Sequence, residues 1–455
     1  MENVTEKLSQ YLASLQYKDL PAEVVNYAKV LLLDSLGVAL YGADKKWSKI
    51  IVEYIKKLGG KEEATIWGTQ FKAPKANTAL ANGVMIHSFE LDDYHNAAKL
   101  HPGAVVISAA LATGETADIH GRQLITSLVC GYETMIRISL GAGPSSAKNR
   151  GWHLTGICGP FGAAAAAGKI TGFGAKKMAN ALGLAGTQAS GLFAFTADGS
   201  MSKRFHPGKA AQNGINAVGL VSQGFTGPTQ ILEAKDGGFC KAVSDDFNLE
   251  RIIYGLGENF EILKISIKPY SCCGSVHSAI DGMLQLRERH HIKTESIEEV
   301  TIGTSSVVKL QCGWDYKPRS ILQAQMSLQY CIAAALLEGQ VFIDQFTEKR
   351  IAAEDVLKLA KKVKVKVDEE IDRVYPNKFS NKVEVLLKDG TTYSIYVEHP
   401  KGSPNNPLSP EEVEEKFKRL TEEIISDKAR GKIFELIDKL EKIESLRSLI
   451  NLISS

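Results

Sequence analysis

The chain has 455 residues and a nearly even balance of 54 basic and 52 acidic side chains, which gives a formal net charge of +2. At the usual ~150 residues per domain, this length predicts about two or three domains. The even charge balance argues against a nucleic-acid surface or a polybasic membrane surface, and 44% hydrophobic content excludes a disordered chain. A small-molecule partner is therefore expected, with no nucleic acid and no membrane.

Three features of the sequence predict a cytoplasmic location. The apolar stretch 30–41 is interrupted by Asp34 and Gly37, so it falls short of the roughly 18 to 20 apolar residues of a membrane span. Glu2 and Glu6 lie in an amphipathic N-terminus, unlike a basic signal peptide. The seven cysteines are odd in number and lack CxxC spacing, which predicts reduced and mostly buried thiols.

From residue 5 to about residue 257, the sequence predicts a large all-helical domain. Apolar residues recur at three- and four-residue spacing, and glycine or proline separates the segments. In the segment 21–41, Pro21 suits a first helical turn and Gly42 a C-terminal stop. This pattern is typical of helices that pack in a core.

Between about residues 260 and 399 the periodicity is mixed, which predicts a smaller α+β domain. Strands are expected at 261–268 and 300–308, and the Asp389-Gly390 turn predicts a β-hairpin that joins 383–387 to 392–397. Helices are expected at 276–288, 322–338 and 353–361.

After the breaker-rich crossing 400–407, charged amphipathic helices are expected over residues 409–452. Ser409 suits an N-cap, and Glu411 and Glu412 suit the first turn. These helices either pack back on the first domain or form a third domain, and the sequence favours the first arrangement.

The densest polar group is HSFELDDYH at 87–95, followed by LHPGAV at 100–105. An apolar helix over 80–91 is expected to lead into Asp92 and Asp93, with His95 and His101 close behind. An acid and potential bases on one short loop are typical of an acid–base site. The alternative is that one aspartate caps a helix and His95 is solvated.

The tripeptide His-Pro-Gly occurs at 101–103 and again at 206–208. Proline at a first helical position predicts that each tripeptide opens a helix, which would place His101 and His206 at the positive end of a helix dipole. Lys203 and Arg204 precede the second tripeptide, so this segment predicts anion binding. The alternative is a pair of solvated basic residues.

Three further residues lie in distinctive motifs. His153 precedes the glycine- and alanine-rich run 155–168, which predicts a tightly packed central helix, with a satisfied core histidine as the alternative. His277 ends KPYSCCGSVH at 268–277, where the adjacent cysteines lack ligand spacing to the other five and argue against a metal site. Tyr330 ends QMSLQY at 325–330 and is by default a core tyrosine.

Six ordered motifs resemble the MmgE/PrpD family of 2-methylcitrate dehydratase, cis-aconitate decarboxylase and iminodisuccinate epimerase. They are HSFELDDYH with LHPGAV, GWHLTGICGPFGAAAAAG, SKRFHPGKAAQNG, KPYSCCGSVHSAID, QMSLQY and HPKGSPNNPLS, and the resemblance covers the full length. It implies a mainly α fold: a large all-helical domain formed by both chain ends (1–265 and 400–455), and an inserted smaller α+β lid domain (266–399).

The resemblance also implies an active site between the domains that contains Asp93, His101, His153, Lys203, His277 and Tyr330. Substrate binding is expected from Lys203, Arg204, His206 and Lys268, of which only Lys203 is carried by the resemblance. The sequence departs from the decarboxylase branch of the family at Ala97, where that branch carries a threonine a few residues after the aspartate.

The reaction implied by the resemblance is a lyase reaction on a di- or tricarboxylate, without metal or cofactor. Dehydration of 2-methylcitrate to 2-methylaconitate in propionate metabolism is expected first, with citrate or cis-aconitate as related substrates. Decarboxylation of cis-aconitate and epimerisation of iminodisuccinate on the same site are the alternatives, and a non-catalytic carboxylate-binding relative is a further one. A homodimer is expected.

Overall fold

The computed structural model describes residues 3–376 and 378–454, and this part of the chain forms two compact units. The helical unit comprises residues up to 88, 92–266 and those from 409 onward, and the α+β unit comprises 89–91 and 267–408. Most of the described residues are helical, so the predicted mainly α fold is confirmed. The three residues Phe89–Leu91, from the middle of the first motif, belong to the α+β unit.

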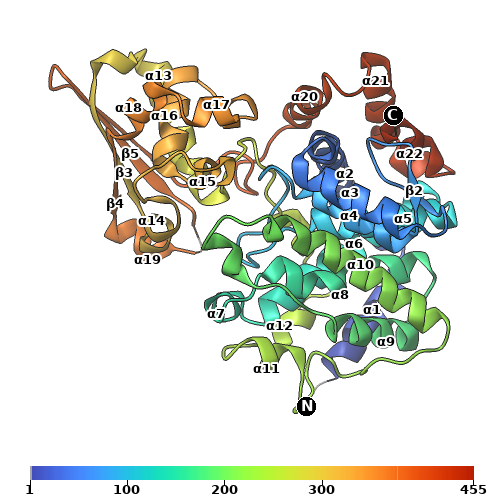
Figure 1. Cartoon of the computed structure of the whole chain (residues 1–455). Helices are drawn as coiled ribbons and strands as arrows, with labels where there is room; N and C mark the ends of the chain where they lie inside the picture. Colours follow the sequence, from blue (N-terminus) through green and yellow to red (C-terminus); the bar gives the residue numbers. More distant parts are fainter. Residues whose placement is uncertain (1–2, 377, 455) are drawn as a thin grey trace. The chain divides into compact units, whose positions relative to one another are not determined.

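The helical unit is built from helices of both chain ends and one small hairpin (Figure 1). Its elements are α1 (Val4–Ser14), η1 (Tyr17–Asp19), α2 (Ala22–Ala43), α3 (Lys46–Leu58), β1 (Ala64–Thr65), β2 (Lys72–Ala73), α4 (Lys75–Ile86), α5 (Gly103–Ala117), α6 (Gly121–Gly141), α7 (Pro144–Asn149), α8 (Leu154–Ile170), α9 (Ala175–Gly186), η2 (Phe193–Thr196), α10 (Ser202–Ser222), α11 (Phe239–Val243), α12 (Glu250–Ile253), η3 (Glu261–Lys264), α20 (Pro410–Thr421), α21 (Asp427–Asp438), η7 (Leu440–Lys442) and α22 (Arg447–Ile453).

Helix α8 lies at the centre of this unit, where it packs against α5, α6, α9 and α10. Its small residues allow close approach: a Cβ added at Gly159 would lie 2.6 Å from Ala210 Cβ on α10. A Cβ at Gly214 of α10 would likewise lie 2.4 Å from Ala163 Cβ. The prediction of a tightly packed central helix at 155–168 is confirmed, and this packing fixes the position of His153 at its N-cap.

The C-terminal helices pack back on the first part of the chain, as predicted. Helices α20 and α21 contact α2, and α20 begins with a capping box in which Ser409 and Glu412 bond to each other's backbone N–H groups. Lys416 of α20 reaches Asp34 of α2, with 2.6 Å between Nζ and Oδ1, and both side chains are buried. The two chain ends are therefore joined by a buried ion pair.

Among the described residues, α2 has the length and apolar content of a membrane-crossing helix. In the structure, 72% of its most apolar window is buried inside the protein. It packs against α4 and α20, as a core helix does. Burial of this kind accounts for its apolar composition.

The α+β unit contains a four-stranded sheet in the order β4-β3-β5-β6, in which β3 pairs parallel with β4 and the other pairs are antiparallel (Figure 1). Helix α13 packs on β5 and β6, and α16 packs on β4. The elements are η4 (Gly274–Val276), α13 (His277–His290), η5 (Thr294–Ser296), β3 (Ile297–Thr304), α14 (Ser306–Cys312), α15 (Ile321–Gln325), α16 (Leu328–Glu338), η6 (Asp344–Phe346), α17 (Glu348–Ile351), α18 (Glu354–Ala360), β4 (Val363–Val367), α19 (Glu369–Val374), β5 (Asn381–Leu387) and β6 (Thr392–Val397). The predicted hairpin is confirmed, with Gly390 at a φ of 89°.

Four predicted elements differ from the structure, and one of them, the helix expected at 322–338, is divided into α15 and α16 at Met326 and Ser327. Residues 261–268 do not form a strand: 261–264 is a 3₁₀ turn, because the Ile262 N–H donates to the Glu133 carboxylate instead of to a neighbouring strand. The strand predicted at 300–308 ends at Thr304, since the Ser305 side chain caps α14. The helix predicted to extend to residue 91 ends at Ile86, and residues 87–101 form an irregular loop.

Candidate functional site

The helical unit gathers four histidines and one aspartate into a histidine cluster, composed of His87, Asp92, His101, His153 and His206. His87 follows the last residue of α4, and His101 lies just before α5. His153 caps α8, and His206 lies in the second turn of α10. Four separate elements of the unit therefore contribute to the cluster.

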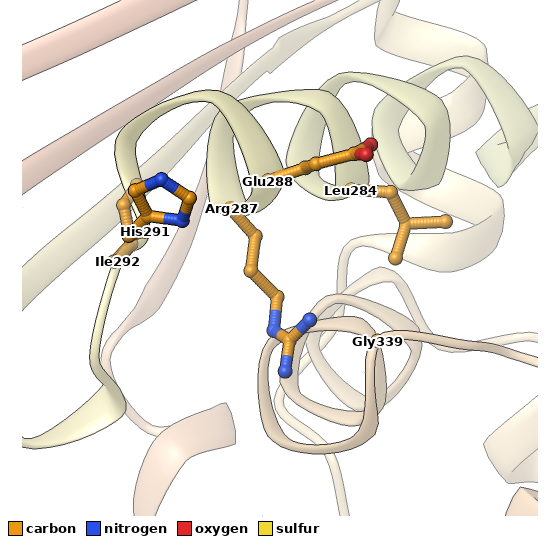
Figure 2. Close-up of a pocket in the computed structure, with 6 residues that line it drawn as sticks. All are labelled: Leu284, Arg287, Glu288, His291, Ile292 and Gly339. Atoms are coloured by element: carbon orange, nitrogen blue, oxygen red, sulfur yellow. The ribbon is translucent and has the colours of Figure 1, made fainter.

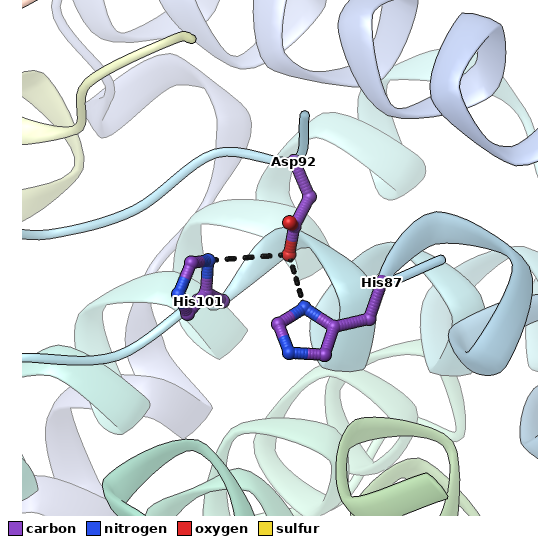
Figure 3. Close-up of side chains that lie close together, drawn as sticks. All are labelled: His87, Asp92 and His101. Carbon is purple, nitrogen blue, oxygen red and sulfur yellow. Dashed lines mark hydrogen bonds and ion pairs between the residues drawn. The ribbon is translucent and has the colours of Figure 1, made fainter. Parts of the chain in front are cut away.

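Asp92 holds two of these histidines at once (Figure 3). Its Oδ2 lies 2.6 Å from His87 Nδ1 and 3.3 Å from His101 Nδ1. His101 Nδ1 also lies 2.9 Å from the Asp93 carbonyl oxygen, and its backbone N–H donates to Thr155 Oγ1. With two acceptors facing Nδ1, the proton of neutral His101 belongs on Nδ1, which leaves Nε2 as a base.

The charge state of the cluster follows from burial and proximity. Burial lowers the pKa of His87 to about 4, and burial with the nearby His87 and His206 holds the pKa of His153 well below its ordinary value. Burial alone would raise the pKa of Asp92, but the flanking His87 and His101 outweigh it and hold that pKa well below its ordinary value. Near neutral pH the cluster therefore combines an ionised Asp92 with neutral His87 and His153.

The predicted anion-binding segment lies on α10, beside the cluster. His206 Nδ1 is 2.9 Å from His153 Nδ1, and the charge of Lys203 helps to lower the pKa values of His87 and His153. Arg204 packs on the Trp47 ring, 4.0 Å from its centroid, and its Nε donates to the Ser88 carbonyl oxygen. Lys203 is thus a cation near the histidines, and Arg204 is held by its contacts with Trp47 and Ser88.

The prediction that His206-Pro207-Gly208 opens a helix is wrong. Helix α10 begins at Ser202, and Pro207 lies inside it. Proline lacks the N–H that would bond to the carbonyl of residue 203, yet the close packing of Gly208 against α4 holds the helix together. Lys203 and Arg204 consequently occupy the first turn, and His206 the second.

The carboxylate of Asp93 is hydrogen-bonded to partners other than His101. It accepts hydrogen bonds from the Tyr132 hydroxyl at 2.8 Å and from the Gly103 N–H at 2.9 Å. Complete burial raises the pKa of Asp93 to about 7. Its carbonyl oxygen, rather than its carboxylate, contacts His101.

The α+β unit holds a second group of predicted residues. Lys268 Nζ lies 3.4 Å from Glu90 Oε2, and both side chains are buried. Glu90 has a backbone φ of 56°. Two hydrogen bonds fix its loop, because Ser271 Oγ and Gln325 Nε2 both donate to the Phe89 carbonyl oxygen. A buried ion pair on a loop with positive φ is typical of functional sites.

His277 and Tyr330 also lie in the α+β unit. His277 opens α13 as predicted, and its Nε2 is 3.4 Å from the Cys272 carbonyl oxygen. Tyr330 is fully buried on α16, packs against Tyr316 and Phe346, and donates its hydroxyl proton to the Gln345 carbonyl oxygen. These contacts are those of a core tyrosine.

Two pockets differ in their relation to these residues. One of about 440 Å³ in the helical unit is lined by Phe195, Phe205, His206 and Lys209, among others, so it reaches the edge of the histidine cluster. Another of about 490 Å³ lies in the α+β unit, where Arg287 extends toward the loop at Gly339 (Figure 2). The second pocket contains none of the predicted site residues.

The sequence matches the models of both domains of one protein family. The N-terminal domain model of MmgE/PrpD matches residues 6–252, and the C-terminal domain model matches residues 270–442. The chain belongs to the MmgE/PrpD family. The predicted resemblance is thereby confirmed over most of the chain.

Several curated MmgE/PrpD relatives are similar to the chain over nearly their whole length. The cis-aconitate decarboxylase of Aspergillus terreus is 29% identical, covering 99% of this chain and 96% of that protein. The cis-aconitate decarboxylase of Homo sapiens is 26% identical over 97% of this chain and 92% of that protein. The cis-aconitate decarboxylase of Mus musculus is 25% identical over 97% of this chain and 91% of that protein.

Three residues that the structure places among the candidates were not assigned to the site from the sequence: His87, Glu90 and Asp92, of which Asp92 was noted only as one of two acids on the loop. All three lie within HSFELDDYH, so the motif itself was found. Which side chains of a loop point to the same place depends on its turns, and no periodicity reveals them. His87 Nε2 and Asp92 Oδ1 are buried without a hydrogen-bond partner among residues 3–376 and 378–454, as expected of atoms that face a ligand site.

Chelation tests whether this MmgE/PrpD protein works without metal. Among the described residues, only His87, Asp92 and His101 bring three ligand atoms within 4.8 Å of one another. The Nδ1 atoms of His87 and His101 both face Asp92 Oδ2, as in a hydrogen-bonded arrangement, so we expect activity to survive exhaustive treatment with EDTA. Activity that is lost with EDTA and restored by added zinc or iron would contradict this prediction.

Proposed function

We propose that this protein is a lyase that acts on a di- or tricarboxylate by moving a proton next to a carboxylate group. The observation that carries the proposal is the pair of Asp92 and His101, with Lys203 nearby. Asp92 orients the imidazole of His101 and favours the tautomer whose Nε2 accepts a proton. Full-length similarity to cis-aconitate decarboxylases supports the same reaction class.

The chemistry explains why these residue types suit such a substrate. Removal of a proton, or of carbon dioxide, next to a carboxylate leaves a carbon that gathers negative charge. A cation placed where that charge develops lowers the barrier, which is the role we assign to Lys203. His101 then takes up the proton or returns it, and in a dehydration the departing hydroxyl also requires a proton from an acid.

Two substrates have specific support. The curated relatives favour cis-aconitate, in which case one carboxylate leaves as carbon dioxide and a proton takes its place on carbon. Ala97, at the position where the decarboxylase branch is expected to carry threonine, weakens the case for decarboxylation, and the dehydration of 2-methylcitrate is the other candidate. Both reactions use the same proton-moving group and the same cation.

A substrate panel in deuterated water tests the proposal. The protein is incubated separately with cis-aconitate, 2-methylcitrate, citrate and iminodisuccinate, and the products are followed by proton and carbon NMR. We expect turnover of at least one tricarboxylate. Loss of carbon dioxide with deuterium in the product identifies a decarboxylase, and loss of water identifies a dehydratase.

The other outcomes are equally informative. Deuterium exchange into iminodisuccinate without net loss of a group identifies an epimerase. Absence of both turnover and exchange with all four compounds contradicts the proposal. A variant with His101→Ala serves as the control, because turnover that persists in it comes from another site or a contaminant.

A further inference from the structure

His153 and His206 form a hydrogen-bonded histidine pair within the histidine cluster. Their Nδ1 atoms lie 2.9 Å apart, and their ring centroids lie 5.1 Å apart. Burial lowers the pKa of both imidazoles, so both are neutral near neutral pH. A neutral imidazole carries one ring proton, so a contact between two Nδ1 atoms requires a proton on one of them and none on the other. The two rings therefore share one proton.

The two histidines of the pair differ in their access to solvent. His153 is only 4% exposed at the N-cap of α8. His206 is half-buried on α10 and lines the pocket of about 440 Å³ in the helical unit. Of the five residues of the histidine cluster, it is the one that lines this pocket. A proton that moves between the solvent of the pocket and His153 therefore has His206 as its carrier.

The surroundings of the pair fix both rings. The His153 N–H donates to the Gly191 carbonyl oxygen at 3.0 Å, and a Cβ added at Gly191 would lie 3.3 Å from His206 Nδ1. Gly191 has a φ of 137°, which also favours glycine. The buried Phe195 ring meets both imidazoles in a T-shaped arrangement, with its centroid 5.2 Å from that of His153 and 5.9 Å from that of His206. This apolar wall beside the shared proton keeps His206 as the partner of His153 Nδ1.

The proposed function requires more than one proton carrier. His101 takes a proton from carbon, and in a dehydration a second group protonates the departing hydroxyl. A buried histidine can be that second group only if every proton that it gives up is replaced. An imidazole can pass a proton on, because it gains one at one ring nitrogen while it loses one at the other.

We propose that His206 is a positioning residue that passes protons between His153 and the solvent of the pocket, which makes His153 the second proton carrier of the site, beside His101. The inference rests on the proposed function and deepens it. It stands on the contact between the two Nδ1 atoms, on the burial of His153 and on the place of His206 in the pocket wall. His206 then acts through His153 and does not bind a carboxylate of the substrate.

The protons balance along the pair. Before turnover, His206 Nδ1–H donates to His153 Nδ1, and His153 carries its own proton on Nε2. In a dehydration, the C–O bond breaks with its electron pair on oxygen, and the Nε2 proton of His153 joins that oxygen to form water. The shared proton moves to His153 Nδ1, and a solvent proton binds His206 Nε2. Both rings stay neutral, and movement of the same protons in the opposite direction restores the pair.

Steady-state kinetics of His206→Gln test the proposal on the substrate found in the NMR panel. Glutamine can hydrogen-bond to His153 but cannot carry a proton through its side chain. We expect kcat to fall about 10-fold to 100-fold, a part of the ~10² to 10⁴ that a positioned proton carrier contributes. KM should change by less than about 2-fold, because the substrate is bound elsewhere. Lys209→Met is the matched control, since Lys209 lines the same pocket but bonds to Gln212 Oε1 at 2.8 Å, and it should leave kcat unchanged.

Chemical rescue distinguishes proton transfer from packing. His206→Ala removes the imidazole next to a pocket large enough to admit a small ring. Added imidazole should restore part of the lost kcat, whereas pyrazole, a ring of the same size but a much weaker base, should not. The melting temperature of each variant shows whether it is folded. If His206→Ala fails to fold, the comparison of His206→Gln with the wild type still decides.

Nitrogen NMR of the protein with isotope-labelled histidines tests the pair without any substrate. In the wild type, one of the two rings should carry its proton on Nδ1 and the other on Nε2, and the His153 Nδ1 signal should move in His206→Ala. The proposal is wrong if His206→Gln keeps the wild-type kcat, if only KM rises, or if imidazole restores no more activity than pyrazole. A wild-type protein that turns over no carboxylate contradicts the proposed function instead, and the NMR spectra then show whether the pair exists.

Discussion

Replacing His101 with alanine is expected to lower kcat by about 10² to 10⁴ on whichever carboxylate the protein turns over. His101 is the one histidine of the cluster that combines a carboxylate partner on Nδ1 with partial exposure, at 18% of its side chain. Removing it leaves no positioned base, while the backbone bond from residue 101 to Thr155 can still form. Steady-state kinetics on the substrate found in the NMR panel give the measurement.

Two controls distinguish a loss of catalysis from a loss of folding. His291→Asn replaces an exposed histidine at the C-terminal end of α13, at a φ of 47° that asparagine tolerates, and should leave kcat unchanged. The melting temperature of the His101→Ala protein should stay close to that of the wild type. A loss of activity that follows a large loss of stability, or full activity without His101, would contradict its assignment as the base.

The sequence allowed most of the fold to be predicted, because helices and strands follow from short-range periodicity. The hairpin at residues 383–397 was predicted from alternation and the Asp389-Gly390 turn, both local signals. The failures have a common cause. Residues 261–268 alternate like a strand, but the Ile262 N–H donates to the Glu133 carboxylate and the buried Glu261 carboxylate binds Arg251 and Lys264, so residues 261–264 form a 3₁₀ turn. A single long-range or ionic contact can override a local pattern.

The motifs that form the candidate site could be predicted from the sequence, but the contacts between their side chains could not. Adjacent aspartates in a loop are equivalent in the sequence, and only the turns of residues 87–101 decide that Asp92 meets His101 while Asp93 meets Tyr132. His206 was predicted to lie at the start of a helix, because proline favours the first helical turn. In the structure, tertiary packing allows α10 to continue without a break at Pro207. Side-chain direction in loops and tolerated prolines in helices both depend on neighbours far away in sequence.

Replacing Lys416 with alanine is expected to destabilise the protein by about 3 to 5 kcal/mol, because it leaves the Asp34 carboxylate buried without its cation. The side chains of Lys416 and Asp34 are 5% and 0% exposed, so water cannot replace the lost charge. The free energy of unfolding is measured by urea titration followed by circular dichroism. Lys418→Ala removes an exposed lysine from the same helix and should cost about 1 kcal/mol or less.

A double variant shows whether the buried charge pair itself accounts for the loss of stability. Combining Lys416→Met with Asp34→Asn removes both charges, so the double variant should be more stable than Lys416→Met alone, since no isolated charge stays buried. The same reasoning explains why a C-terminal helix can secure the first long helix of the chain: its lysine is the partner that makes a carboxylate tolerable inside α2. If Lys416→Ala costs less than about 1 kcal/mol, the ion pair contributes little, and apolar packing of Phe417 near Gly37 holds α20 in place instead.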